Sequence, residues 1–256
     1  MRSQDDTRVG RWFREVRHSP NPQTRLICFP HAGGLASFFR PWGQLVPPGT
    51  ELLAVRYPGR EDRFLEPFAE TMDELVEQIA GECVRLLDAP LAFFGHSMGA
   101  SVAYEVALRL QAEHGAAVSA LFVSGRSGPG REHIRPLSGA SDHQLMKELT
   151  ELGGTDAEAF EDAELRELVL PTIRADYRLV EAYTATKAGA ALNAPVTAYY
   201  GTRDAEVSRD SVEAWAEVTD SGFRMLPFEG GHFFLLDHPR AIVDDIRSRL
   251  DPIARR

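Results

Sequence analysis

Cysteine is scarce in this 256-residue chain, and no apolar run is long. Cys28 and Cys83 lack the spacing of a disulfide framework or a metal site, so we expect two buried free thiols in a reducing compartment. Residues 1–22 contain no apolar stretch of signal-peptide length, and no later run could span a bilayer. These absences predict a cytoplasmic protein and exclude disulfide-rich scaffolds and membrane spans.

Positive charge is also in short supply. The chain has 28 lysines and arginines against 38 aspartates and glutamates, a net charge of −10. Nucleic acids and anionic membranes would be repelled, so neither is an expected partner. Only Lys147 and Lys187 are lysines, and arginine's forked donors suit phosphate, although codon bias in the host explains the same excess of arginine.

Short apolar runs alternate with helical patterns, and the length allows one domain over residues 1–256. Residues 1–23 are expected to form a polar arm, attached to the core only around Trp12 and Phe13. The predicted strands are Arg25–Phe29, Leu52–Val55, Leu91–Phe94, Val118–Ser124, Pro195–Gly201 and Phe223–Leu226. Strands that alternate with helices favour a mostly parallel sheet with helices on both faces, an α/β fold.

The segment Gly95-His96-Ser97-Met98-Gly99 links the strand at Leu91 to a helical pattern. A serine at such a turn is presented at a helix N-terminus, where backbone N–H groups favour developing negative charge. Strand, tight turn and helix together are typical of the nucleophile elbow of α/β-hydrolases. A plain strand-to-helix turn is the alternative.

A second glycine-containing turn, Pro30-His31-Ala32-Gly33-Gly34, follows the first predicted core strand. In hydrolases with a nucleophile elbow, an N–H after an early strand helps to bind the oxyanion. We therefore expect the backbone N–H groups of Ala32 and Met98 to form an oxyanion hole. The alternative is a connection with no catalytic role.

Two further residues complete a candidate triad with Ser97. Asp204 directly follows a late strand, and His232 lies behind two glycines in a loop after the next strand. Serine, acid and histidine then occur in the order found in α/β-hydrolases. A neutral imidazole can take the serine proton, and a buried carboxylate can fix its tautomer. The competing acids have blander positions in a helix start, in a turn and after the histidine: Asp210, Asp220 and Asp237.

Residues 126–192 interrupt the alternation with two helical patterns, Asp142–Leu152 and Asp162–Tyr183, the second broken at Pro171. A helical insertion at the edge that carries the catalytic residues would form a lid over the site. Two ordinary packing helices on the back of the sheet would give the same periodicity.

Five motifs together resemble type II thioesterases, the free-standing editing enzymes of polyketide and nonribosomal peptide synthases. The motifs are Phe29–Gly34, Arg56–Glu61, Gly95–Gly99, Tyr200–Asp204 and Gly230–Phe234. The resemblance extends from about Thr24 to Leu250. It implies an α/β-hydrolase fold, the triad and oxyanion donors named above, and a mobile lid.

The resemblance also implies the substrate, an acyl group on the phosphopantetheine arm of an acyl or peptidyl carrier protein. Carrier proteins of this kind are acidic, so a chain at −10 needs local positive charge to dock them. Arg126, Arg131 and Arg135 are candidates, and a solvated basic loop is the alternative. We expect a monomer with no cofactor and no metal. A carboxylester hydrolase or acyltransferase with the same triad, or a degenerate hydrolase that only binds a synthase, are the rival functions.

Overall fold

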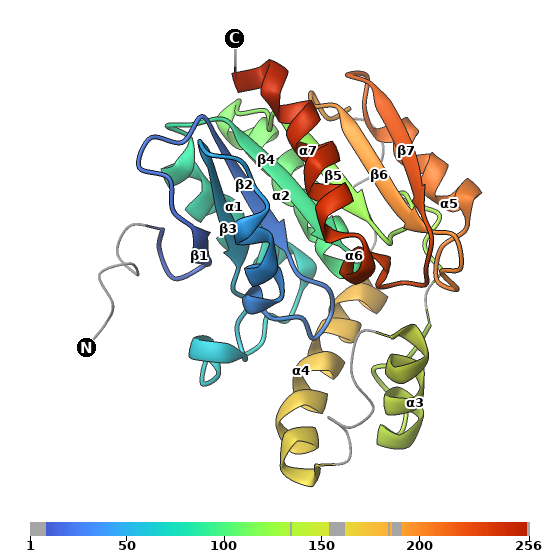
Figure 1. Ribbon diagram of the computed structural model, residues 1–256. Coiled ribbons are helices and arrows are strands. Elements are labelled where there is room, and N and C mark those ends of the chain that lie inside the picture. Colours follow the sequence, from blue (N-terminus) through green and yellow to red (C-terminus); the bar gives the residue numbers. More distant parts are fainter. Residues whose placement is uncertain (1–8, 134, 154–161, 184, 186–190, 255–256) are drawn as a thin grey trace.

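The computed structural model describes residues 9–133, 135–153, 162–183, 185 and 191–254. Its centre is a seven-stranded sheet in the order β1-β3-β2-β4-β5-β6-β7 (Figure 1). The strands are β1 Phe13–Arg17, β2 Thr24–Phe29, β3 Thr50–Val55, β4 Leu91–His96, β5 Ala120–Ser124, β6 Val196–Gly201 and β7 Phe223–Phe228. β1 is antiparallel to β3, and every other neighbouring pair is parallel. The predicted α/β fold with a mostly parallel sheet is confirmed.

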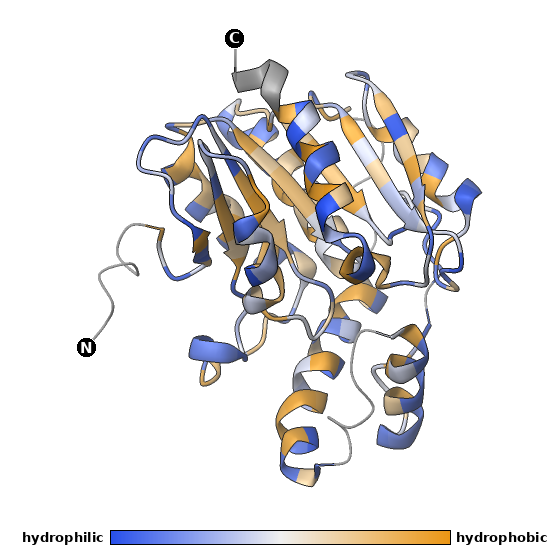
Figure 2. Cartoon of the chain, viewed as in Figure 1, coloured by the Kyte–Doolittle hydropathy of each residue, from blue (hydrophilic) through white to orange (hydrophobic). Residues whose placement is uncertain are grey.

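Helices cover both faces of the sheet because successive strand residues point to opposite sides. Ile27 and Phe29 of β2 belong to the core under α1 (Met72–Cys83) and α2 (Met98–His114). Leu26 and Cys28 belong to the core under α7 (Pro239–Ala254) and the 3-10 helix Ala36–Gln44. Figure 2 shows the central strands as predominantly hydrophobic, whereas α7 alternates hydrophilic and hydrophobic residues. The remaining short helices are Glu61–Arg63, Val84–Leu86, α5 Arg209–Glu213, Ala214–Val218 and α6 Phe234–Asp237.

Two helices, α3 (Asp142–Leu152) and α4 (Ala163–Ala182), occupy the insertion between β5 and β6 (Figure 1). Ser141 caps α3 and Asp162 caps α4 through their side-chain oxygens, as expected for these residue types. The two helices share a small hydrophobic core that includes Leu145, Leu149 and Ile173. Both predicted helices are present, although the segment between them lies outside the described residues.

Three details differ from the sequence predictions. Phe13–Arg17, assigned to the polar arm, forms edge strand β1, because Trp12 and Phe13 are buried in the core and anchor it there. Pro171 does not interrupt α4, which is one continuous 20-residue helix. Helix α7, which no predicted element covered, buries an apolar stripe that includes Ile242 and Ile246. Within the described part of the chain, no helix has the length and hydropathy to cross a bilayer.

Candidate active site

Ser97 lies at a sharp turn between β4 and α2. Its backbone has φ 52° and ψ −120°, a conformation that a non-glycine residue adopts only when the surroundings impose it. A Cβ atom on Gly95 would lie 2.2 Å from the Gly99 carbonyl oxygen, and one on Gly99 would lie 2.1 Å from that of Phe29. Only glycine fits at both positions, so the turn brings strand and helix into direct backbone contact and leaves the serine at the helix N-terminus.

Asp204 and His232 lie in hydrogen-bond contact. Asp204 follows β6 and His232 follows β7, and the distance from His232 Nδ1 to Asp204 Oδ2 is 2.8 Å. The side chains are 5% and 0% exposed, His232 first, so little water competes for this bond. The other carboxylate oxygen of Asp204 accepts the backbone N–H of Glu206 at 2.8 Å.

The imidazole of His232 lies beside the nucleophile turn. Its ring centroid is 5.0 Å from that of His96, the residue that directly precedes Ser97. Strands β4, β6 and β7 run in the same direction, so the residues that follow them emerge at one edge of the sheet. The competing acids Asp210, Asp220 and Asp237 are exposed.

The two candidate oxyanion donors are the backbone N–H groups of Ala32 and Met98. Met98 is the first residue of α2, where an N–H has no acceptor within its own helix. Among hydrogen bonds of the described residues, none uses the N–H of Ala32. The main chain of β2 also touches the elbow directly, since Gly99 packs on the carbonyls of Phe29 and Pro30. The two donors therefore belong to segments in backbone contact.

Two other histidines pack near His232, namely His96, which is buried, and His31, which is partly buried. Burial lowers the pKa of His31 to about 3 and that of His96 well below its ordinary value, and His232 opposes their protonation further. His96 Nδ1 lies 3.0 Å from the hydroxyl of Ser124. Phe233 contacts the rings of His31, His96 and His232 edge-on. The imidazoles of His31 and His96 therefore stay neutral at physiological pH.

The three arginines proposed for carrier docking differ in exposure and in their partners. Arg126 turns inward, and its Nε donates to the hydroxyl of Ser101, one helical turn beyond Ser97. Burial lowers the pKa of Arg126. Arg135 Nη1 lies 2.7 Å from a carboxylate oxygen of Glu148 in α3, so it already has a partner. Arg131 is 62% exposed, and its Nη2 lies 3.9 Å from Glu217.

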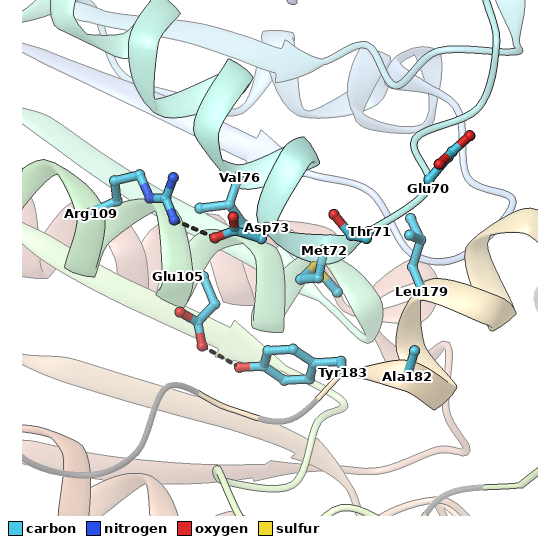
Figure 3. A pocket seen from close by; sticks show the side chains of 10 residues that line it. All are labelled: Glu70, Thr71, Met72, Asp73, Val76, Glu105, Arg109, Leu179, Ala182 and Tyr183. Atoms are coloured by element: carbon cyan, nitrogen blue, oxygen red, sulfur yellow. Dashed lines mark hydrogen bonds and ion pairs between the residues drawn. The ribbon is translucent and has the colours of Figure 1, made fainter.

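A cavity of about 340 Å³ lies where the end of α4 meets α1 and α2 (Figure 3). Figure 3 shows Tyr183 reaching across it to Glu105 of α2, and the hydroxyl donates to Oε1 at 2.6 Å. Burial and the neighbouring Glu105 carboxylate raise the pKa of Tyr183. Arg109 closes another side through its ion pair with Asp73. The Tyr183–Glu105 bond fastens the end of α4 to α2, and the Arg109–Asp73 pair joins α2 to α1.

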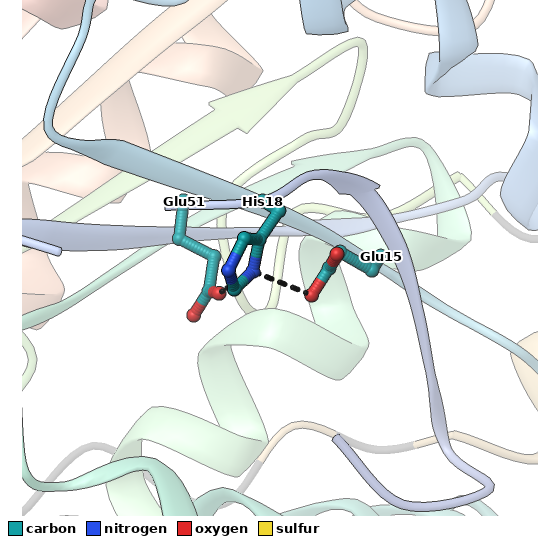
Figure 4. A group of neighbouring side chains, drawn as sticks. All are labelled: Glu15, His18 and Glu51. Carbon is teal, nitrogen blue, oxygen red and sulfur yellow. Dashed lines mark hydrogen bonds and ion pairs between the residues drawn. The ribbon is translucent and has the colours of Figure 1, made fainter. Parts of the chain in front are cut away.

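One group in the described part of the chain has the residue types of a metal site, namely Glu15, His18 and Glu51 (Figure 4). The Nδ1 of His18 lies 3.2 Å from Glu15 and 3.7 Å from Glu51. Glu51, fully buried, also accepts from Arg25 Nε at 2.6 Å. An arginine at this distance neutralises the carboxylate, so the group is built as an ion-pair cluster near the edge of the sheet.

Known proteins resemble this chain over most of its length. The thioesterase domain family matches residues 24–250. Thioesterase PikA5 of Streptomyces venezuelae is 40% identical over 242 residues, which are 94% of this chain and 86% of PikA5. The type II thioesterase BorB from the borrelidin biosynthetic cluster is 41% identical, covers 93% of this chain and 97% of its own, and superposes with a TM-score of 0.86.

The type II thioesterase YbtT from the yersiniabactin NRPS/PKS pathway is 30% identical. The match covers 95% of this chain and 99% of YbtT, with a TM-score of 0.85. Gramicidin S biosynthesis protein GrsT of Aneurinibacillus migulanus is 34% identical over 95% of both chains. The family match over residues 24–250 therefore spans strands β2 to β7, the insertion and the positions of all five motifs.

Proposed function

Since this chain belongs to the thioesterase family, we propose that it is a type II thioesterase that removes acyl groups from the phosphopantetheine arm of acyl or peptidyl carrier proteins. Its role would be editing, the release of stalled or aberrant acyl units from a polyketide or nonribosomal peptide synthase. The observation that carries the proposal is a strained serine at the elbow with a buried His232–Asp204 pair beside it, in a chain of which 93% and 95% match two type II thioesterases.

In the proposed acylation step, Ser97 Oγ attacks the thioester carbonyl and gives its proton to Nε2 of His232. The 2.8 Å bond to Asp204 supports this direction of transfer, because it keeps the proton of the neutral ring on Nδ1 and leaves Nε2 free to accept. The N–H groups of Ala32 and Met98 stabilise the oxyanion, an effect worth about 3 kcal/mol per donor. The carbon–sulfur bond then breaks, and Nε2 of His232 gives its proton to the departing sulfur, so the carrier leaves as the free thiol and the ring is neutral again.

In the proposed deacylation step, water replaces the thiol. His232 Nε2 takes a proton from water, the hydroxide attacks the acyl-serine, and the proton passes to Ser97 Oγ as the carboxylic acid departs. A thiol of pKa about 8.5 is a good leaving group, so binding and presentation of the acyl chain should limit turnover more than bond cleavage does. Helices α3 and α4 would act as the lid that excludes water during acylation.

The three candidate arginines differ in how available they are to dock an acidic carrier. Arg131 is the exposed one, whereas Arg135 is paired with Glu148 and Arg126 faces Ser101. We expect Arg131→Glu to slow hydrolysis of acyl-carrier while sparing a small N-acetylcysteamine thioester. An equal loss on both substrates would count against docking at this residue.

The working form is proposed to be a cytoplasmic monomer. Cys28 and Cys83 support a reducing compartment, because both are free and buried and burial raises the pKa of each thiol. Size-exclusion chromatography with light scattering checks the oligomeric state.

The test of the proposed function is hydrolysis of a short acyl chain on a holo-carrier protein, followed by mass spectrometry of the carrier. Wild type should release the free acid and regenerate the carrier thiol, and Ser97→Ala should not. Ser119→Ala, a serine outside the site, is the matched control and should behave as wild type. Hydrolysis by Ser97→Ala would overturn the proposed mechanism.

Two further measurements separate the rivals. A carboxylester hydrolase would prefer the matched oxygen ester, and an acyltransferase would form an ester when an alcohol is added. A protein that only binds its synthase would leave Ser97 unlabelled by a fluorophosphonate. We expect preference for the thioester, free acid as the product, and labelling of Ser97.

A further inference from the structure

The turn that carries the Ala32 N–H is held by a residue from the helical insertion. The backbone N–H of Gly33 donates to Oδ2 of Asp176 at 2.7 Å. Asp176 belongs to α4 and is 3% exposed, so this carboxylate points into the protein and away from solvent. Gly33 directly follows Ala32, so Asp176 binds the N–H next along the chain from the proposed oxyanion donor.

Arg60 fixes the other side of that carboxylate. Its Nη1 and Nη2 lie 2.6 and 2.7 Å from the two oxygens of Asp176, a forked ion pair. Nη1 also donates to the Gly34 carbonyl at 3.3 Å. Arg60 is 5% exposed, so the pair is buried, and removal of one partner would leave the other charge without compensation.

Helix α4 also rests directly on the same turn. Gly33 has φ +73°, and a Cβ atom there would lie 2.5 Å from Cγ1 of Ile173. The hydroxyl of Thr172 donates to the Gly59 carbonyl at 3.3 Å. One turn of α4 therefore presents a hydroxyl, an apolar side chain and a carboxylate to the two loops that follow β2 and β3.

The motif Arg56–Glu61 has no role in the triad chemistry. Its side chains hold the turn that contains Ala32. Tyr57 donates its hydroxyl hydrogen to the Pro30 carbonyl at 3.2 Å. The carboxylate of Glu61 accepts the N–H groups of Ala36 and Ser37, where the chain leaves the turn. The motif thus binds the chain before, within and after the segment that contains Ala32.

We propose that Asp176 and Arg60 are positioning residues of the oxyanion hole, so that the seating of α4 sets the position of the Ala32 N–H. The inference rests on the proposed function, in which that N–H stabilises the tetrahedral oxyanion. A donor displaced by about 1 Å loses much of its effect on the transition state. Chemistry at Ser97 therefore depends on α4 being docked against Gly33.

The test compares Asp176→Asn with wild type on an N-acetylcysteamine thioester, which needs no carrier. We expect kcat to fall on the order of 10- to 100-fold with KM unchanged, because the oxyanion donor acts in the transition state. A trifluoromethyl ketone analogue, which Ser97 attacks to form an oxyanion adduct, should lose affinity by a similar factor. A role limited to stability would lower the melting temperature and leave kcat and ketone affinity per folded molecule intact.

Arg60→Lys is the second variant. It keeps the cation and loses the fork, so it should fold if Asp176→Asn does not, and it should show a smaller loss of the same kind. Asp142→Asn is the matched control, because it breaks the ion pair of Arg174 with α3, Nη2 to Oδ1 2.6 Å, without touching the turn. It should leave kcat unchanged.

If folded Asp176→Asn keeps the kcat and ketone affinity of wild type, the positioning role is overturned and the proposed function stands. If Asp176→Asn does not fold, the same result in folded Arg60→Lys overturns the positioning role. Absence of any Ser97-dependent hydrolysis by wild type would overturn the proposed function instead.

Discussion

Replacing Asp204 by asparagine tests whether the acid controls the tautomer of His232. In the structure one carboxylate oxygen accepts the Glu206 N–H at 2.8 Å, and the other faces His232 Nδ1 at 2.8 Å. An asparagine has one oxygen, which suits the Glu206 N–H, so its NH₂ group would point at the ring. Nδ1 must then accept, and the ring proton moves to Nε2.

An imidazole with its proton on Nε2 cannot take the proton of Ser97. We expect kcat on an N-acetylcysteamine thioester to fall about 10⁴-fold at neutral pH, a loss of about 5.5 kcal/mol of transition-state stabilisation. The melting temperature should change little, because the hydrogen-bonding groups are kept. Asp210→Asn, at an exposed acid in α5, is the control and should retain wild-type activity. Activity of folded Asp204→Asn within about tenfold of wild type would refute the assignment of the triad acid.

Three further predictions follow from buried groups. In the unfolded chain His31 has its ordinary pKa of about 6.5, whereas the fold lowers that pKa to about 3. The contribution of His31 to the free energy of unfolding should therefore be fully present above pH 6.5 and should fall by about 2 kcal/mol at pH 5. Thermal denaturation from pH 7 to 5 checks this. His31→Gln should make the pH dependence less steep without removing it, because the pKa of His96 is lowered as well; an unchanged slope would contradict the prediction. Gly99→Ala should cost more than about 3 kcal/mol and abolish fluorophosphonate labelling, because its Cβ would overlap the Phe29 carbonyl, whereas Gly139→Ala, with open space around it, should do neither. Cys28 and Cys83 should react with an aromatic disulfide only after unfolding, because burial raises the pKa of each thiol; rapid reaction of the native protein would contradict their burial.

Elements with a local signal could be predicted from the sequence. The central strands are apolar runs bounded by turns, and α3 and α4 show helical periodicity, so their positions agree closely with the structure. The order of Ser97, Asp204 and His232 comes from local turns after strands, and the structure places the last two 2.8 Å apart.

Features that depend on partners distant in the sequence could not be predicted from it. Asp176 resembles a solvated acid on an amphipathic helix, and only its contact with Arg60, 116 residues away, shows that it is buried. The sequence does not predict β1 because Arg14, Glu15 and Arg17 give it no apolar run. Charged residues of this kind are compatible with a strand at the edge of a sheet. Arg126 was expected at the surface because a basic loop gives no sign of which way each side chain turns.

The antiparallel strand β1 has a practical consequence for shortening the protein. The family match begins at Thr24, which invites a truncation that removes Phe13–Arg17. Every residue of β3 is buried, and β1 covers its outer edge. Without that cover, the unpaired backbone groups of β3 would be open to pairing with the same strand of another molecule. Such a truncation should yield aggregates rather than a smaller working enzyme.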